Sequence, residues 1–159
     1  MWQLRKATVA DQATIARLEA ALFGAESWGA AGVAAELGNP ARGYFVAEDG
    51  GEIIGYAGIT LFSQADIMTV AVVPQCRRQG IAQALLQALE QEAEAAKVFE
   101  VFLEVRSRNE GARGLYEKNG YRAVREIKNY YHSPADTAVV MRKRLRAPLV
   151  VGAEVTGKQ

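Results

Sequence analysis

Apolar residues recur along the chain with two different periods, and these periods divide the sequence into predicted strands and helices. Residues 2–7 alternate between apolar and polar side chains, which is typical of a strand. Thr8 and Asp11 carry oxygens that can cap a helix, and beyond them Ile15 and Leu22 lie at helical spacing. The chain therefore begins with a predicted strand followed by a helix.

A second helix and a hairpin are predicted next. Ser27 can cap the helix, and Asn39-Pro40 ends it because proline cannot continue a helix. The apolar stretches 44–48 and 52–61 flank Asp49-Gly50-Gly51, where glycine tolerates the positive φ that a tight turn needs. These residues predict two antiparallel strands.

A third strand and the longest helix follow the hairpin. Residues 65–73 are rich in β-branched side chains, and the stretch ends at Pro74. From about 79 to 96 the apolar period becomes about 3.6 residues, with Ile81 and Leu89 on the apolar stripe. The period therefore predicts a helix over this range.

The remaining predicted elements are two strand regions around a short helix. A strand is expected at 98–106, a helix at 109–119 closed by Gly120, and a strand pair at 121–128 and 138–145. The strand, helix, strand passage in the middle of the chain implies one parallel or splayed pairing. We therefore expect an α/β (α+β) fold, with a mostly antiparallel mixed sheet of about seven strands and about four helices.

The composition agrees with one globular unit. The chain has 159 residues, of which 50% are hydrophobic, and this is enough to bury a sizeable core. We find no repeat, low-complexity tract or linker that would divide it. We expect a single domain over residues 1–146 and a flexible C-terminal tail over residues 147–159.

Charge, cysteine content and apolar run length argue against a disulfide, a metal site and a membrane span. With 19 Lys and Arg against 18 Asp and Glu, the net charge is +1, so a charged ligand must be met by a local patch. Cys76 is the only cysteine and His132 the only histidine, so we expect no disulfide and no metal site. We see no signal peptide and no run near the roughly 18 apolar residues of a membrane span, and therefore expect a cytoplasmic protein.

The segment after the third predicted strand has the character of an anion-binding loop. Arg77, Arg78 and Gly80 stand where the long helix begins. There the backbone N–H groups have no partners in the helix, and the helix dipole favours negative charge. Gly80 leaves room for a phosphate, and Ala82 is nearly as small. The alternative is that both arginines are solvated charges and Gly80 serves packing, and the residues alone leave this open.

This loop and three later segments resemble a known family. Arg77-Arg78-Gln79-Gly80-Ile81-Ala82 is similar to the Arg/Gln-x-x-Gly-x-Gly/Ala pyrophosphate loop of the GNAT acyltransferases. Leu103-Glu104-Val105-Arg106, Leu115 to Tyr121 and Asn129-Tyr130-Tyr131 resemble the RimI-type ribosomal-protein-alanine N-acetyltransferases. The likeness runs from about residue 44 to 145. It is looser over 24–42, where that family shapes its acceptor groove.

The resemblance implies a GNAT fold and acetyl-coenzyme A (acetyl-CoA) as cosubstrate, with no metal. The residues it assigns to the pyrophosphate are Arg77, Arg78, Gln79, Gly80, Ile81, Ala82 and Gln83. Backbone groups of Val70, Ala71 and Val72 would line the acetyl and pantetheine arm, and one N–H there would stabilise the charge that develops on the acetyl oxygen. Asn109 would hydrogen-bond the pantetheine, or alternatively cap the helix that follows it.

Glu104 is the candidate general base. Strand alternation places it on the same side as Phe102 and Arg106, with Val105 on the other side. From the residues alone, an ordinary surface glutamate paired with Arg106 or with another charge is the alternative. The resemblance assigns Glu104 the removal of a proton from the acceptor amine, directly or through water. Such a base is needed because an α-amine with a pKa of about 8 is mostly protonated at neutral pH.

Tyr116 is the candidate general acid. Its alternative role is that of a core aromatic whose hydroxyl reaches the surface. The resemblance implies that Tyr116 protonates the departing coenzyme A thiolate. A phenol with a pKa of about 10 can donate a proton to a thiolate with a pKa of about 8.5 if the site shifts these pKa values modestly.

Further residues have weaker functional interpretations. Asn129, Tyr130 and Tyr131 resemble the segment that contacts the acceptor peptide, although an aromatic pair also suits an ordinary sheet edge. Cys76 lacks the His or Asp context of a nucleophile, and His132 is expected to be a solvated loop residue. The basic residues in 142–146 are most simply solvated charges, with a ribosomal or acidic-protein contact as the alternative.

The expected activity is acetyl transfer from acetyl-CoA to the N-terminal α-amine of a protein, by direct attack in a ternary complex. The family's acceptor is the N-terminal alanine of a small-subunit ribosomal protein. The alternatives are acetylation of lysine side chains or of a small amine, and a non-catalytic acetyl-CoA sensor or adaptor. Glu104 and Tyr116 together argue against the sensor. We expect a monomer or weak dimer, with no direct nucleic-acid partner and no membrane.

Overall fold

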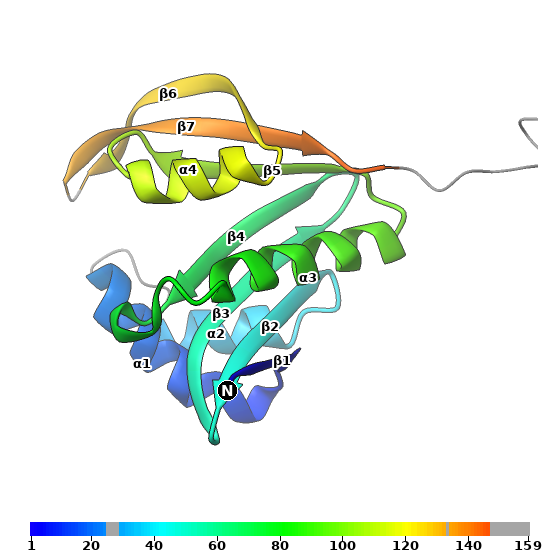
Figure 1. The fold of residues 1–159 in the computed structure, drawn as a ribbon, viewed down its shortest axis with the longest axis vertical. Helices are drawn as coiled ribbons and strands as arrows, with labels where there is room; N and C mark the ends of the chain where they lie inside the picture. Colours follow the sequence, from blue (N-terminus) through cyan, green and yellow to red (C-terminus); the bar gives the residue numbers. More distant parts are fainter. Residues whose placement is uncertain (25–28, 133, 147–159) are drawn as a thin grey trace, which may run out of the picture.

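A mixed sheet with the strand order β1-β2-β3-β4-β5-β7-β6 forms the centre of the molecule. The computed structural model describes residues 1–24, 29–132 and 134–146. Within these ranges the seven strands are β1 (Gln3–Lys6), β2 (Arg42–Asp49), β3 (Glu52–Leu61), β4 (Ala65–Val72), β5 (Glu100–Arg106), β6 (Arg122–His132) and β7 (Ala135–Arg144). The helices are α1 (Gln12–Phe23), α2 (Gly29–Leu37), α3 (Ile81–Ala95) and α4 (Glu110–Lys118), as Figure 1 shows. The predicted fold class is confirmed.

The sheet parts in its middle. β4 and β5 are its parallel neighbours, and they pair only at Ala65 with Val101 and at Asp66 with Phe102. Beyond these two pairs the strands diverge, which Figure 1 shows as a widening gap between them. The other neighbouring strands are antiparallel. The predicted splayed pairing is therefore present, and it leaves the facing edges of β4 and β5 without a partner strand.

Helices cover both faces of the first half of the sheet. The α3 side chains Ile81, Leu85 and Leu89 are buried in one large core, and α3 packs on β2, β3 and β4. On the opposite face, Ile15 of α1 and Val33 of α2 share a smaller core with Tyr56. The predicted apolar stripes of α1 and α3 are thus the buried faces of these helices.

Strand β5 follows the predicted alternation. Val101, Leu103 and Val105 are buried in the large core, whereas Glu104 is exposed. Cross-strand partners point to the same side of a sheet, so Asp66 of β4 and Phe102 of β5 lie on the side of Glu104. We call this side, opposite the large core, the groove face.

Several boundaries differ from the sequence prediction. α3 begins at Ile81 rather than 79, because Gly80 adopts a left-handed conformation with φ of 80°. Strand β6 continues to His132 rather than ending at 128, through a register shift in which Asn129 has φ of 56°. β7 correspondingly begins at residue 135 rather than 138.

Asp11 has a different partner from the one predicted. It was expected to cap the first helix, but its carboxylate accepts two hydrogen bonds from Arg5 at 2.8 and 2.9 Å and one from the Thr8 N–H at 2.8 Å. No side-chain cap bond from Asp11 to α1 is present. The Arg5 guanidinium holds the pKa of the Asp11 carboxyl below its ordinary value. The predicted Ser27 cap and the predicted tail 147–159 lie outside the described residues.

Candidate active site

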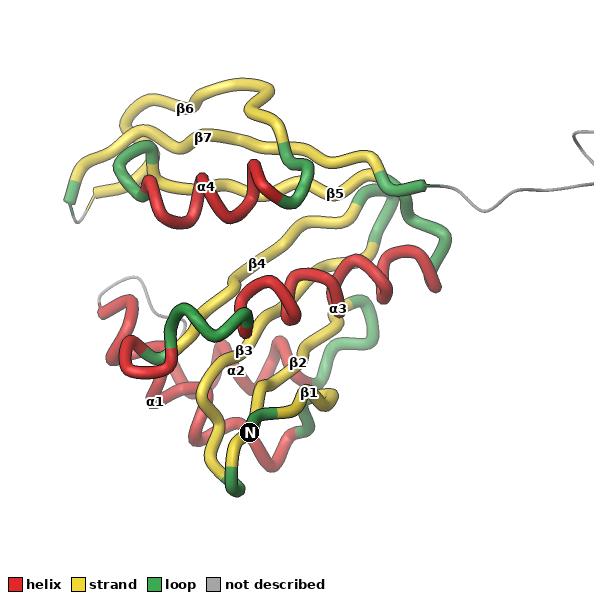
Figure 2. The backbone as a smooth tube through the Cα atoms, in the orientation of Figure 1, coloured by secondary structure: helices red, strands yellow, loops and turns green. Residues whose placement is uncertain are grey.

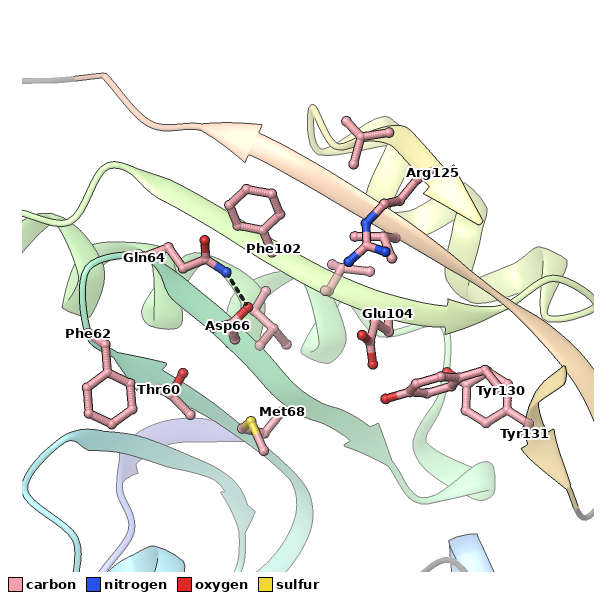
Figure 3. Close-up of a pocket in the computed structure, with 14 residues that line it drawn as sticks. Thr60, Phe62, Gln64, Asp66, Met68, Phe102, Glu104, Arg125, Tyr130 and Tyr131 are labelled. Atoms are coloured by element: carbon pink, nitrogen blue, oxygen red, sulfur yellow. Dashed lines mark hydrogen bonds between the residues drawn. The ribbon is translucent and has the colours of Figure 1, made fainter. Parts of the chain in front are cut away.

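Two cavities meet where β4 and β5 part, and Glu104 lines both of them. The larger, of about 790 Å³, lies on the groove face, and Figure 3 shows Glu104 pointing into it beneath Arg125. The smaller, of about 420 Å³, reaches from α1 across the gap to α4. Glu104 therefore stands at the passage between two spaces.

The smaller cavity brings together residues that are far apart in the sequence. Val70 of β4, Glu104 and Arg106 of β5, and Asn109 and Tyr116 from the α4 region all line it. Four of these are predicted site residues. Ala71 and Val72, also predicted, do not line either cavity, since their side chains are buried in the two cores.

Tyr116 is enclosed at the bottom of this site. Its side chain is 8% exposed and packs edge-on against Tyr121, with ring centroids 5.9 Å apart. Burial raises the pKa of the Tyr116 hydroxyl to about 12. Tyr116 is consequently a protonated, neutral donor throughout the physiological pH range.

Asn109 has the structural role that the sequence left open. It is the N-cap of α4, and its side-chain oxygen accepts the N–H of Ala112 at 3.1 Å. Asn109 also lines the smaller cavity, so the same residue caps α4 and forms part of the cavity wall.

Glu104 interacts with the predicted acceptor segment. The Tyr130 hydroxyl faces the Glu104 carboxylate (Figure 3), and its interaction with this carboxylate is the main reason that the pKa of Tyr130 is raised. Tyr131 lies edge-on to Tyr130, with ring centroids 5.0 Å apart, and the Arg106 guanidinium lies 4.2 Å from the Tyr131 ring centroid. Figure 3 shows both tyrosines beside Glu104. Asn129, in contrast, is exposed and lines neither cavity.

The loop between β4 and α3 has the properties of an anion cradle. Figure 2 shows it running from the end of β4 into α3. Arg78 and Gly80 have φ of 65° and 80°. The first intrahelical bond in α3 runs from Ala84 N–H to Gly80 O, and the backbone N–H groups of 78–83 have no acceptor in the described part of the chain. These donors stand at a helix N-terminus, which is where phosphate groups bind.

Gly80 has a backbone requirement in addition to the predicted room for a phosphate. A Cβ added there would meet no atom within 4 Å, so no neighbour crowds this position. Its positive φ is what excludes other residues. The open space above it remains available to a ligand. Arg77 lies next to this space, and its Nε donates to the Val72 carbonyl at 3.2 Å, which fixes the loop to the end of β4.

Several side chains in the cavities were not predicted from the sequence. Glu19 of α1 lines the smaller cavity, is buried, and accepts a hydrogen bond of 2.6 Å from the Tyr56 hydroxyl. Its position four residues after Ile15 interrupts the apolar stripe of the helix, and that was the available signal. Asp66, on the groove face of β4, and Met68, at a register shift in that strand, line the larger cavity.

The other candidates lie away from this centre. His132 is exposed, and it ends β6 rather than lying in the predicted loop. Cys76 is half-buried in a single 3-10 turn before α3. Across residues 1–24, 29–132 and 134–146 there is no cluster of three potential metal ligands, and no helix there is long and apolar enough to cross a membrane.

Comparison with known proteins shows which family the chain resembles. The profile of the acetyltransferase (GNAT) family matches residues 12–121. The chain is 34% identical to the N-alpha-acetyltransferase RimI of Mycobacterium tuberculosis over 142 residues, which cover 86% of this chain and 88% of that protein. It is 37% identical to an N-alpha-acetyltransferase of Sulfurisphaera tokodaii over 58% of this chain and 64% of the relative.

A solved structure shows the same architecture. The ribosomal-protein-S18-alanine N-acetyltransferase of Escherichia coli superposes with a TM-score of 0.84 and 25% identity, over 94% of this chain and 97% of that one. The resemblance found in the sequence is confirmed, and the chain belongs to the GNAT acetyltransferase family.

Proposed function

We propose that the protein transfers the acetyl group of acetyl-CoA to the N-terminal α-amine of a protein, with the N-terminal alanine of a small-subunit ribosomal protein as the acceptor. The observation that carries this proposal is the position of Glu104, which lines both the cavity beside α4 and the cavity on the groove face. A group that serves two substrates entering from different sides has to stand at such a junction.

The loop and the gap fit acetyl-CoA. The unpartnered N–H groups of 78–83, together with Arg77 and Arg78, offer donors and positive charge to a pyrophosphate. The unpaired edge of β4 around Val70 offers backbone groups to an extended amide-bearing arm. Acetyl-CoA would supply the acetyl thioester there.

Glu104 is the proposed base. It is exposed, so water reaches its carboxylate, and the Tyr130 hydroxyl lies beside it (Figure 3). An incoming α-ammonium group with a pKa of about 8 would lose its proton to Glu104, directly or through one water molecule. The neutral amine then attacks the thioester carbon.

Tyr116 is the proposed acid. Because burial raises its pKa to about 12, complete proton transfer to a thiolate with a pKa of about 8.5 would cost roughly 5 kcal/mol in the empty site. We therefore assign Tyr116 a hydrogen bond to the sulfur that strengthens as charge develops, and the proton follows as the thiol leaves. This is a narrower role than the sequence alone suggested.

The larger cavity suits a polypeptide acceptor. Among its lining residues, Phe62, Met68, Val124 and Tyr130 are large apolar side chains exposed to solvent. Exposed apolar groups that gather in one hollow are typical of a binding surface. Asp66 and Glu104 add two carboxylates, and Arg125 adds one guanidinium. A small amine would leave most of this surface uncovered.

A thiol-release assay tests the proposal. We expect release with a peptide that begins with alanine, slower release when the first residue is methionine or glycine, and none when the N-terminus is blocked. Release with the blocked peptide only when it contains lysine would establish lysine acetylation instead. Calorimetric binding of acetyl-CoA without release on any peptide or small amine would favour a non-catalytic sensor.

A further inference from the structure

Positive charge is concentrated in the second half of the chain. Residues 100–146 contain eleven Lys and Arg against six Asp and Glu, whereas residues 1–99 contain seven against eleven. The net charge of +1 thus conceals a strong separation between β1–β4 with α1–α3, and β5–β7 with α4.

Strand register places four arginines on the groove face. Arg142 pairs with Phe102, and Arg144 with Glu100, so both share the side of Glu104. On β6, Arg122 pairs with Arg142, and Arg125 pairs with Val140, which in turn pairs with Glu104. We call Arg122, Arg125, Arg142 and Arg144 the arginine surface, and all four side chains are exposed.

Lys143, which lies between Arg142 and Arg144 in the sequence, differs from them in its surroundings. Lys143 alternates to the opposite side, where its Nζ forms a 3.0 Å ion pair with Glu90 of α3. That cation is half-buried and neutralised within the fold, whereas the arginines on either side of it in the sequence are directed to solvent. The arginine surface is therefore not part of the core.

The arginine surface is poorly neutralised. Its one acidic contact in the described chain is Glu100, at 3.3 Å from Arg144 and 3.9 Å from Arg142. Arg122 and Arg125 form no ion pair with the residues that the structure describes. Arg122 also lies directly opposite Arg142, and like charges in that position destabilise a strand pair. This repulsion does not stabilise the fold. Binding of an anionic partner explains the clustered arginines better.

We propose that the arginine surface binds the phosphate backbone of RNA. It consists of guanidinium groups on one exposed sheet face, spaced by about 5 Å between strands and about 7 Å along a strand. Nucleic acid carries one negative charge on every nucleotide, so one strand can engage several of these groups together. An acidic polypeptide would need carboxylates at successive alternate positions to do the same. Arginine also binds phosphate in a bidentate manner.

The position of this surface links it to the active site. Arg125 lines the larger cavity, and it lies two strand spacings, about 10 Å, from Glu104. An acceptor N-terminus at Glu104 would therefore bring anything bound to the acceptor close to the arginine surface. If the acceptor is the ribosomal protein proposed above, RNA is its natural neighbour. The RNA contact itself involves none of the reacting groups.

Binding of a fluorescein-labelled RNA hairpin, measured by fluorescence anisotropy against salt, tests this inference. With about three phosphates neutralised, affinity should fall roughly twenty- to fortyfold between about 50 and 200 mM salt, the range set by single-stranded and duplex slopes. The triple variant Arg122→Gln, Arg142→Gln, Arg144→Gln should bind at least tenfold more weakly with a flatter slope. Arg17→Gln, on exposed α1, is the matched control and should bind like the parent protein.

Two further measurements make the test decisive. The triple variant should keep its thermal midpoint and its acetylation rate on a short peptide, which separates loss of RNA binding from misfolding and from failure of the proposed reaction. Equal RNA binding by the triple variant and the Arg17 control would overturn the inference. Competition by poly-glutamate as effective, charge for charge, as competition by RNA would assign the surface to an acidic protein instead.

Discussion

The hydroxyl of Tyr130, on β6, faces the carboxylate of Glu104, on β5 (Figure 3). Strand β7 lies between the two strands in the sheet, so Tyr130 reaches Glu104 across an intervening strand. The register shift between Ile127 and Tyr131 is what brings Tyr130 over the groove face. An irregularity in the edge strand therefore places a hydroxyl beside the proposed base (Figure 3).

Replacing Glu104 with glutamine should abolish most turnover while leaving acetyl-CoA binding intact. The amide cannot accept the proton of the α-ammonium group, and we expect a loss of about a hundredfold or more in kcat. Calorimetric titration with acetyl-CoA and steady-state kinetics at several pH values would measure the two effects. Glu117→Gln, on the exposed side of α4, is the control and should be unaffected. Full activity of Glu104→Gln would remove Glu104 from the mechanism.

Replacing Tyr116 with phenylalanine should lower kcat by about ten- to a hundredfold with little change in KM, because the sulfur loses its hydrogen-bond donor only as charge develops. The ring remains, so its contact with Tyr121 is retained. An unchanged kcat would show that the leaving thiolate is protonated by another group or by water.

Tyr116 also predicts an alkaline effect on stability. Its pKa is raised from 10.0 to about 12 in the folded protein, so unfolded chains release this proton at lower pH than folded ones. The contribution of Tyr116 to stability is fully present below pH 10 and is lost as the pH rises toward 12, by about 2 to 3 kcal/mol. The free energy of unfolding, measured with denaturant between pH 9 and 12, should fall less steeply with pH in Tyr116→Phe than in the parent protein. Parallel curves for the two proteins would contradict the assignment.

Substitution of Gly80 by valine should weaken acetyl-CoA binding by about tenfold or more, since a β-branched residue does not hold φ of 80° and the cradle would change shape. Gly50→Val is a matched control, because Gly50 also has positive φ and open space at its Cβ but lies in the β2–β3 turn. Both variants should lose roughly 1 to 2 kcal/mol of stability. Equal acetyl-CoA affinity in the two would show that the loop does not hold the cosubstrate.

Asp11→Asn should destabilise the fold by roughly 1 to 2 kcal/mol near neutral pH, because Arg5 would lose its paired carboxylate. The pKa of Asp11 is lowered in the folded state, so its contribution is present above its unfolded value of 3.8 and disappears as the pH falls below that value. Urea unfolding would measure the difference in free energy of unfolding between parent and variant. This difference should be smaller at acid pH than at pH 7. A difference that stays constant would mean that the ion pair does not stabilise the fold.

Local patterns were sufficient for much of this fold. The alternation in β5 identified the exposed side of Glu104, and the glycines at 50 and 51 do adopt the positive φ predicted for the hairpin. The anion cradle was predicted because its donors are backbone groups at a helix start, a property that any sequence with Gly80 there would share. These features depend on neighbours in the chain.

What escaped prediction depends on residues far apart in sequence. Glu19 meets Tyr56 and the smaller cavity only because α1 packs across the face of β3 and β4. The arginine surface depends on the order β5-β7-β6, which places Arg122 beside Arg142. Asn129 resembled an acceptor contact, yet its left-handed backbone serves the register shift and the side chain lies outside both cavities. Pattern alone does not specify such pairings.

The parting of β4 and β5 after Asp66 gives the protein an edge in its interior. Sheet edges in most proteins lie at the periphery, where water saturates their donors and acceptors. Here a row of backbone groups without a partner strand lies at the centre of the molecule, between two half-sheets joined by two residue pairs. An extended ligand that enters this row would act as the missing strand. Binding would then complete the hydrogen-bond ladder, and the two half-sheets should exchange their amide hydrogens as one unit only once it is filled.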